Sequence, residues 1–206
     1  MKLMSVDKGQ LLIIFYKNPV PGQVKTRLAA TVGRKRALDI YNQLVLKTKE
    51  QTFGLPLAKI VYYSDRVDEN DVWDVEGDHY AKLVQGEGDL GMKMHRAIAH
   101  GFQEGYTSIC LIGSDCWEIT PAVLQDAFHM LEKKEVVLGP ARDGGYYLIG
   151  MNKENSQLFT GKSWSTDRVL TDTLADAKRQ GLSVGLLPVL SDVDYAEDLP
   201  EELKGW

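Results

Sequence analysis

Four segments of this chain carry residues suited to binding phosphate or a metal ion. The first, residues 17–28, reads Lys-Asn-Pro-Val-Pro-Gly-Gln-Val-Lys-Thr-Arg-Leu and follows an apolar run. Pro21 and Gly22 stiffen the turn ahead of two cations, Lys25 and Arg27. A rigid loop with two exposed cations could hold a diphosphate through charge-assisted hydrogen bonds. A stiff surface loop with solvated cations is the alternative, and the glycines of a Walker A motif are missing.

The second segment, residues 85–91, reads Gln-Gly-Glu-Gly-Asp-Leu-Gly and has the G-x-G-x-x-G spacing of a dinucleotide-binding turn. It is not the first strand–helix turn of the chain, and Glu87 and Asp89 would place negative charge against a pyrophosphate. We therefore interpret it as a tight turn that brings Gln85, or the backbone at Gly88, close to a nucleotide.

The third segment, residues 111–116, is an apolar strand that stops on Gly-Ser-Asp. A carboxylate at the end of a strand, beside small residues, suits a hard divalent cation such as Mg²⁺ or Mn²⁺ held together with substrate phosphates. This predicts a metal-binding role for Asp115. The alternative is an aspartate that caps the next turn.

The fourth segment, residues 139–150, contains Asp143 followed by Gly144 and Gly145. Adjacent glycines allow a backbone to approach a ligand closely, although Asp-Gly is also a strong hairpin-turn signal. We expect Gly144 and Gly145 to contact the acceptor or sugar, and Asp143 to act as the general base. Near the C-terminus, Asp192 and Asp194 would share a face of an extended segment, unless Asp194 caps a helix.

The elements that would position these residues alternate in period along the chain. Helical faces are predicted over residues 37–48, 90–101, 120–131 and 166–180. Strands are predicted at 11–16, 59–63, 80–84, 108–112, 135–138, 146–149 and 184–188. The link between 138 and 146 is too short for a parallel crossover, so that pair should be antiparallel. The pattern predicts one domain over 1–206, a three-layer αβα sandwich around a mixed, mostly parallel sheet.

Composition excludes several other classes of protein. The formal charge is −5, which disfavours general binding of nucleic acid or an anionic membrane. No apolar run approaches the roughly 20 residues of a membrane span, and two cysteines give no disulfide framework. We expect a cytoplasmic protein, and its oligomeric state stays open between a monomer and a homodimer.

Taken together, the four motifs resemble one bacterial family. Pro-x-Pro-Gly-x-Val-Lys-Thr-Arg-Leu, Gln-Gly-x-Gly-Asp-Leu-Gly, Ile-Gly-Ser-Asp-Cys and Gly-Pro-x-x-Asp-Gly-Gly-Tyr-Tyr-Leu-Ile-Gly occur in that order between about residues 11 and 199. The order is similar to the glycosyltransferase-like, radical-SAM/selenodomain-associated transferases of the nucleotide-diphospho-sugar transferase superfamily. The resemblance implies a glycosyltransferase-A-like fold. It also implies that Asp115 and Asp194 bind the metal of a metal–nucleotide complex.

Three functions are compatible with these residues. The first is metal-dependent glycosyl transfer from a nucleoside-diphosphate sugar to an unknown small-molecule acceptor. Lys25 and Arg27 would hold the diphosphate, and Asp115 and Asp194 would place Mg²⁺ or Mn²⁺. The second is nucleotidyl transfer, in which a phosphorylated small molecule attacks a nucleoside triphosphate. The third is a nucleotide-binding module without catalysis.

Overall fold

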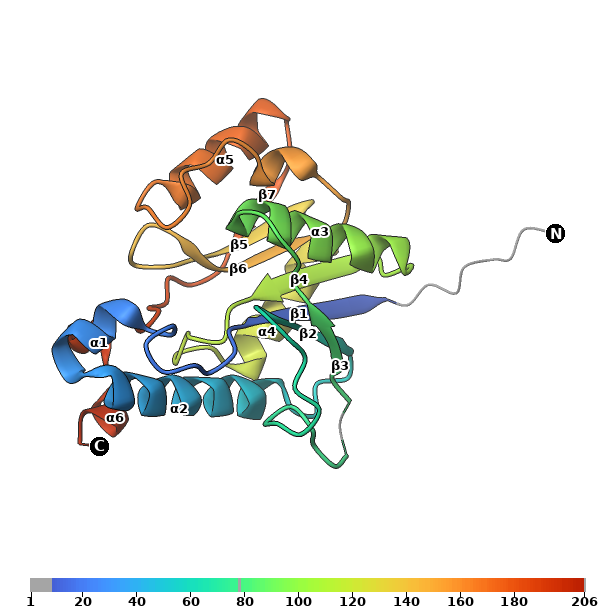
Figure 1. Ribbon diagram of the computed structural model, residues 1–206. Coiled ribbons are helices and arrows are strands. Elements are labelled where there is room, and N and C mark those ends of the chain that lie inside the picture. The colour runs from blue at the N-terminus through green and yellow to red at the C-terminus, as the bar shows by residue number, and fades with distance from the viewer. Residues whose placement is uncertain (1–8, 78, 206) are drawn as a thin grey trace.

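The central sheet has seven strands in the order β3-β2-β1-β4-β6-β5-β7 (Figure 1). It belongs to a computed structural model that describes residues 9–77 and 79–205, so both ends of the expected domain 1–206 lie outside the described residues. The strands are β1 (Gln10–Tyr16), β2 (Ala58–Tyr63), β3 (Ala81–Val84), β4 (Ser108–Ile112), β5 (Val136–Pro140), β6 (Tyr146–Met151) and β7 (Val184–Leu186).

Strand β6 gives the sheet its mixed character. It pairs antiparallel with both β4 and β5, whereas the β1–β2, β1–β4, β2–β3 and β5–β7 pairs are parallel. This confirms the mostly parallel sheet and the antiparallel hairpin expected from the short link after residue 138. Because β1 and β4 are parallel neighbours in the centre of the sheet, their carboxyl ends lie side by side at the same end of the strands.

Helices cover both faces of the sheet, as Figure 1 shows. They are α1 (Thr26–Val32), α2 (Arg34–Thr52), α3 (Leu90–Gln103), α4 (Pro121–Leu131), α5 (Val169–Arg179) and α6 (Glu201–Lys204), with 3-10 turns η1 (Ser156–Phe159) and η2 (Ala196–Asp198). Two starts follow from capping: the Asp89 carboxylate accepts from Met92 N (2.8 Å), and the Thr120 hydroxyl accepts from Val123 N (3.3 Å). Satisfying these amides stabilises the first turns of α3 and α4.

Alternation along β1 divides its side chains between two cores. Leu12, Ile14 and Tyr16 pack with α2 and α4, whereas Leu11 and Ile13 pack with α3 and α5. A third cluster joins α1 and α2 to the C-terminal segment through Leu28, Ala37, Ile40, Leu44, Val193, Leu199 and Leu203. The three layers are therefore confirmed, and the C-terminal segment returns to the N-terminal helices.

The helix predicted from residue 166 begins three residues later, at Val169. Residues Trp164–Arg168 form turns instead, and Ser165 has a positive φ of 63° that a helix does not allow. No helix among the described residues is long and apolar enough to cross a bilayer. The cytoplasmic location and the oligomeric state stay predictions.

Candidate active site

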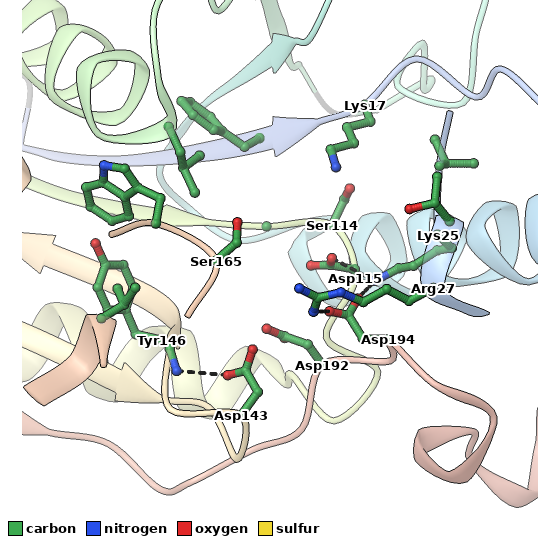
Figure 2. A pocket seen from close by; sticks show the side chains of 18 of the residues that line it. Lys17, Lys25, Arg27, Ser114, Asp115, Asp143, Tyr146, Ser165, Asp192 and Asp194 are labelled. Atoms are coloured by element: carbon green, nitrogen blue, oxygen red, sulfur yellow. Dashed lines mark hydrogen bonds and ion pairs between the residues drawn. The ribbon is translucent and has the colours of Figure 1, made fainter. Parts of the chain in front are cut away.

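A cavity of about 480 Å³ opens where β1 and β4 end, within the roughly 300–1,000 Å³ range of small-molecule sites. Lining on its other side comes from Asp143, Gly145, Tyr146, Trp164, Ser165, Thr166 and Val169, of which Figure 2 labels Asp143, Tyr146 and Ser165. Three cations and four acids line it: Lys17, Lys25, Arg27, Asp115, Asp143, Asp192 and Asp194. Its position beyond the carboxyl ends of parallel strands is where ligands bind in open α/β sheets.

Asp115 reaches this cavity because the residues before it are small and fixed. A Cβ at Gly113 would lie 2.6 Å from Asp115 Oδ1, so a larger residue there would displace the carboxylate. Ser114 Oγ lies 3.3 Å from the hydroxyl of Tyr41. That hydroxyl also accepts from Lys17 N and donates to Lys17 O, at 3.0 and 2.8 Å. Tyr41 thus ties the end of β4 to the end of β1.

Asp194 is brought beside Asp115 by the C-terminal segment. Cys116 and Asp192 form an isolated antiparallel bridge, and Val193 N donates to Asp115 O at 3.3 Å. Asp194 does not cap a helix through its side chain. Instead Asp198 Oδ2 accepts from Asp194 N (3.1 Å), and the Asp194 carboxylate points to the cations of the first loop (Figure 2).

Lys25 lies between the two proposed metal ligands. Its Nζ donates to Asp115 Oδ2 at 2.8 Å and to Asp194 Oδ1 at 3.0 Å. Arg27 Nη1 reaches the other oxygen of Asp194 at 3.1 Å. The Lys25 side chain is only 5% exposed, against 47% for Arg27, so the expectation of two exposed loop cations holds for Arg27 alone.

Burial and neighbouring charges shift the pKa values of two carboxyl groups in this site, Asp115 and Asp192. Burial opposes ionisation of Asp115, but the charge and hydrogen bond of Lys25 hold the pKa of Asp115 below its ordinary value. Burial and the charge of Asp115 raise the pKa of Asp192 well above its ordinary range. Asp192 Oδ1 is also buried without a hydrogen-bond partner among the described residues.

Two carboxylates that converge on one cation, beside an unpaired buried carboxyl oxygen, are hard oxygen donors of the kind Mg²⁺ and Mn²⁺ accept. The part of the chain that the structure describes contains no group of three or more His, Cys, Asp and Glu side chains able to hold a metal. Substrate phosphates would have to complete the coordination, as is common for Mg²⁺. Asp115 and Asp194 therefore fit a divalent metal ion, provided that substrate phosphates supply the remaining oxygen ligands.

Asp143 lies across the cavity from these cations in the turn between β5 and β6 (Figure 2). Its Oδ1 accepts from Gly145 N at 2.8 Å, so the segment is a hairpin turn and also lines the cavity at Asp143 and Gly145. Gly144 has a φ of +89° and abuts the backbone of Asp167, whereas Gly145 has no positive φ. Gly144 is outside the cavity lining, so its expected contact with a ligand stays a prediction.

The remaining residues of the predicted phosphate site divide into two groups. Gln85 lines the cavity, but its Nε2 already donates to Tyr62 O at 3.0 Å. Pro21, Gly22 and Gly88 are not among the lining residues. Gly22 and Gly88 have φ values of +79° and +109°, so their observed role is to shape the two loops.

Several lining residues were missed by the sequence argument. Lys17 is a third cation, and its position directly after a predicted strand could have identified it. Trp164, Ser165 and Thr166 come from a segment expected to lead directly into a helix. The turn at Ser165 has a positive φ, a conformation that serine rarely adopts, so it could not be predicted from the sequence.

Comparison with known proteins agrees with the fold. Residues 50–166, more than half of the chain, match the family described as "Uncharacterized protein conserved in bacteria (DUF2064)". No curated protein matches the chain. A structure from Desulfovibrio desulfuricans G20, provisionally described as a nucleotide-diphospho-sugar transferase, is 31% identical, covers 92% of this chain and 84% of that chain, and has a TM-score of 0.82.

More distant structures share the fold alone. The inositol-1-phosphate CTP transferase of T. maritima is 14% identical over 96% of this chain and 94% of its own, with a TM-score of 0.56. Glucosyl-3-phosphoglycerate synthase of Mycobacterium tuberculosis, solved with Mn²⁺, UDP and glucosyl-3-phosphoglycerate, is 13% identical over 96% of this chain and 75% of its own, with a TM-score of 0.53. The family match and the D. desulfuricans structure support the nucleotide-diphospho-sugar transferase superfamily. The narrower radical-SAM/selenodomain-associated group stays a prediction.

Proposed function

This chain belongs to the DUF2064 family and has the fold of nucleotide-diphospho-sugar transferases, and we propose that it is a metal-dependent glycosyltransferase using a nucleoside-diphosphate sugar. The observation that carries the proposal is the convergence of Lys25, Asp115 and Asp194 at one point of the cavity floor. Both the D. desulfuricans protein and the mycobacterial synthase bear names of sugar-transferring enzymes.

The residues of the chain divide the work between the two sides of the cavity. Lys17, Lys25 and Arg27 would bind the diphosphate through charge-assisted hydrogen bonds. Asp115 and Asp194 would hold Mg²⁺ or Mn²⁺, which when bound supplies charge stabilisation to the leaving diphosphate. Across the cavity, Asp143 would accept the proton of the attacking acceptor hydroxyl.

Nucleotidyl transfer is the second candidate, because the T. maritima structure with the same fold is named as a CTP transferase. One feature of the cavity favours glycosyl transfer over nucleotidyl transfer. All of its lining cations come from residues 17–27, whereas the described lining residues from 143–146 and 164–169 include no Lys, Arg or His. A phosphorylated acceptor would need cations on that side, but an uncharged hydroxyl compound would not.

Product analysis tests the reaction. Protein is incubated with Mn²⁺, a panel of nucleoside-diphosphate sugars and nucleoside triphosphates as donors, and a panel of hydroxyl compounds and phosphorylated small molecules as acceptors. Release of free nucleoside diphosphate supports glycosyl transfer, and release of pyrophosphate supports nucleotidyl transfer. Tight nucleotide binding without turnover of any donor would instead support the non-catalytic module.

The metal requirement has its own test. Calorimetry should show strong nucleotide binding in Mg²⁺ or Mn²⁺ and little in EDTA, because the three lining cations already face four acids and leave little positive charge for the phosphates. Asp115→Asn should lose both the metal dependence and most of the affinity. Equal affinity in EDTA and in metal, for wild type and variant alike, would remove the metal from the proposal.

A further inference from the structure

Lys25 is far less exposed than the two carboxylates that it bridges. Its side chain is 5% exposed, while those of Asp115 and Asp194 are 37% and 32% exposed. The ammonium is thus largely shielded from solvent while it neutralises both carboxylates. Figure 2 shows the Lys25 side chain extending to this pair from the first loop.

The backbone of Lys25 is held in an unusual conformation. Its φ and ψ are 45° and 48°, the left-handed region, and its carbonyl oxygen accepts from Ala29 N at 2.8 Å as α1 begins. The described residues include only one other non-glycine with positive φ, Ser165, and it also lines the cavity. Conformations of this kind persist where the surroundings determine them, and they cluster at ligand sites. The backbone of the loop thus starts the Lys25 side chain within reach of both carboxylates.

An ammonium in this position and a divalent cation exclude each other. Oxygen ligands lie roughly 2.0–2.6 Å from Mg²⁺ or Ca²⁺, so a metal bridging Asp115 and Asp194 would overlap the space of the Lys25 ammonium. The two positive charges would also repel at that distance. We propose that Lys25 is a resident counter-ion that blocks free divalent cations, and that the site admits the metal only together with the nucleotide phosphates.

Phosphate resolves the competition because it offers Lys25 a new anionic partner. The lysine stem is flexible, and Arg27 and Lys17 line the same cavity, so an entering diphosphate meets several donors. Once the ammonium turns to phosphate, both carboxylates are released for the metal. Metal and nucleotide then strengthen each other's binding by the same factor. This inference rests on the proposed function, since it takes Asp115 and Asp194 as the metal ligands.

The test measures metal binding without nucleotide. Mn²⁺ is titrated into nucleotide-free protein, and unbound Mn²⁺ is counted by its EPR signal. Lys25→Met should bind one Mn²⁺ with a dissociation constant at least about tenfold lower than that of wild type, within the usual range of site coupling. Lys25→Arg, which keeps the charge, should bind no better than wild type. Adding Asp115→Asn to Lys25→Met should abolish the gain.

Lys82 provides a matched control elsewhere in the fold. Its Nζ also bridges two carboxylates, Asp71 at 3.0 Å and Asp74 at 2.7 Å, and its side chain is 12% exposed. Those carboxylates have other donors, including the Tyr63 hydroxyl and Asp71 N. Lys82→Met makes the same change in net charge as Lys25→Met. Because Asp71 and Asp74 keep these other donors, Lys82→Met should leave Mn²⁺ binding as in wild type. Melting curves verify folding of each variant, and Lys25→Gln is the second neutral variant if Lys25→Met melts early.

Two results would overturn the inference. Wild type could bind free Mn²⁺ as tightly as Lys25→Met, which would show that the ammonium is no barrier and would leave the proposed metal site intact. Alternatively, Lys25→Met could gain nothing, or no more than Lys82→Met. A failure of the proposed function looks different, because nucleotide would then bind equally well in EDTA.

Discussion

Lys25 and Arg27 carry the same charge in very different surroundings. Removing Lys25 leaves Asp115 and Asp194 without their shared cation, whereas the Arg27 pair is exposed to solvent. Lys25→Ala should cost roughly 1–3 kcal/mol of unfolding free energy, less than a fully buried pair because both carboxylates are about a third exposed. Arg27→Ala should cost about 0–1 kcal/mol.

Urea unfolding measures both variants, and both should weaken nucleotide binding. Equal stability of the two variants would mean that Lys25 is not the enclosed partner of the carboxylates. Full nucleotide affinity in either variant would remove that residue from the diphosphate site.

Asp143 separates the hairpin interpretation from the catalytic one. The carboxylate oxygen that accepts from Gly145 N has an equivalent in asparagine, so Asp143→Asn should keep the turn and the melting temperature. An amide cannot act as a general base, so turnover should fall by roughly 10²–10⁴-fold with nucleotide affinity unchanged. Steady-state rates and calorimetry on the same preparation measure both. Retained turnover would leave Asp143 a turn residue.

For single residues, the position of Asp115 could be predicted from the sequence, but the burial of Lys25 could not. Asp115 was predictable because an apolar strand ended on small residues and an acid, and the strand β4 ends there. The burial of Lys25 was not predictable. It depends on Asp194, which is 169 residues away along the chain, and loop cations are ordinarily solvated.

The turn between β5 and β6 is the element in which two adjacent glycines differ. A Cβ on Gly144 would overlap the backbone of Asp167 and would also sit at a φ of +89°, whereas a Cβ on Gly145 would lie 3.2 Å from Asp143 Oδ1. Gly144→Ala should therefore destabilise the protein by about 1–3 kcal/mol and displace the 164–168 segment. Gly145→Ala is the matched control.

Thermal unfolding reports on the stability, and the change in tryptophan fluorescence, to which Trp164 contributes with three other tryptophans, reports on the displaced segment. The contact that transmits them is the hydrogen bond from Leu170 N to Gly144 O, at 2.9 Å, which joins the turn to the start of α5. If Gly145→Ala destabilises more than Gly144→Ala, the positive φ is not what this turn requires.

Element types followed from periodicity more reliably than their ends did. The hairpin was predictable from a link too short for a crossover, and Asp89 and Thr120 cap helices as their residue types suggest. The start of α5 was not, because tertiary contacts hold Trp164–Arg168 in turns. Gly91 contributes to that arrangement, since a Cβ there would overlap the Phe159 carbonyl and the Trp164 ring.

Over the whole molecule, the site depends on the two ends of the domain meeting. Val193, 1% exposed, packs with Leu28 and Leu203 in the third cluster and so fixes the neighbouring Asp194 beside the first loop. Local periodicity carries no information on such a contact. The family resemblance does, because it implies that Asp115 and Asp194 share one metal site, and Lys25 bridges the two carboxylates.

We expect the overall acidity of the protein to make nucleotide binding depend on a divalent cation, and this dependence can be measured as a change in stability. The formal charge is −5, and the cavity itself has three cations against four acids, so a diphosphate adds charge to a site that is not strongly positive. A nucleotide-sugar at about 100 times its dissociation constant should stabilise the fold by roughly 2.7 kcal/mol. For a domain of this size that corresponds to a rise in melting temperature of about 5–10 °C.

A thermal-shift screen of nucleotides and nucleotide-sugars should show this rise with Mg²⁺ or Mn²⁺ and lose most of it in EDTA or in Asp115→Asn. A rise of the same size in EDTA would mean that Lys17, Lys25 and Arg27 suffice for the phosphates, and that the carboxylates serve only to hold Lys25.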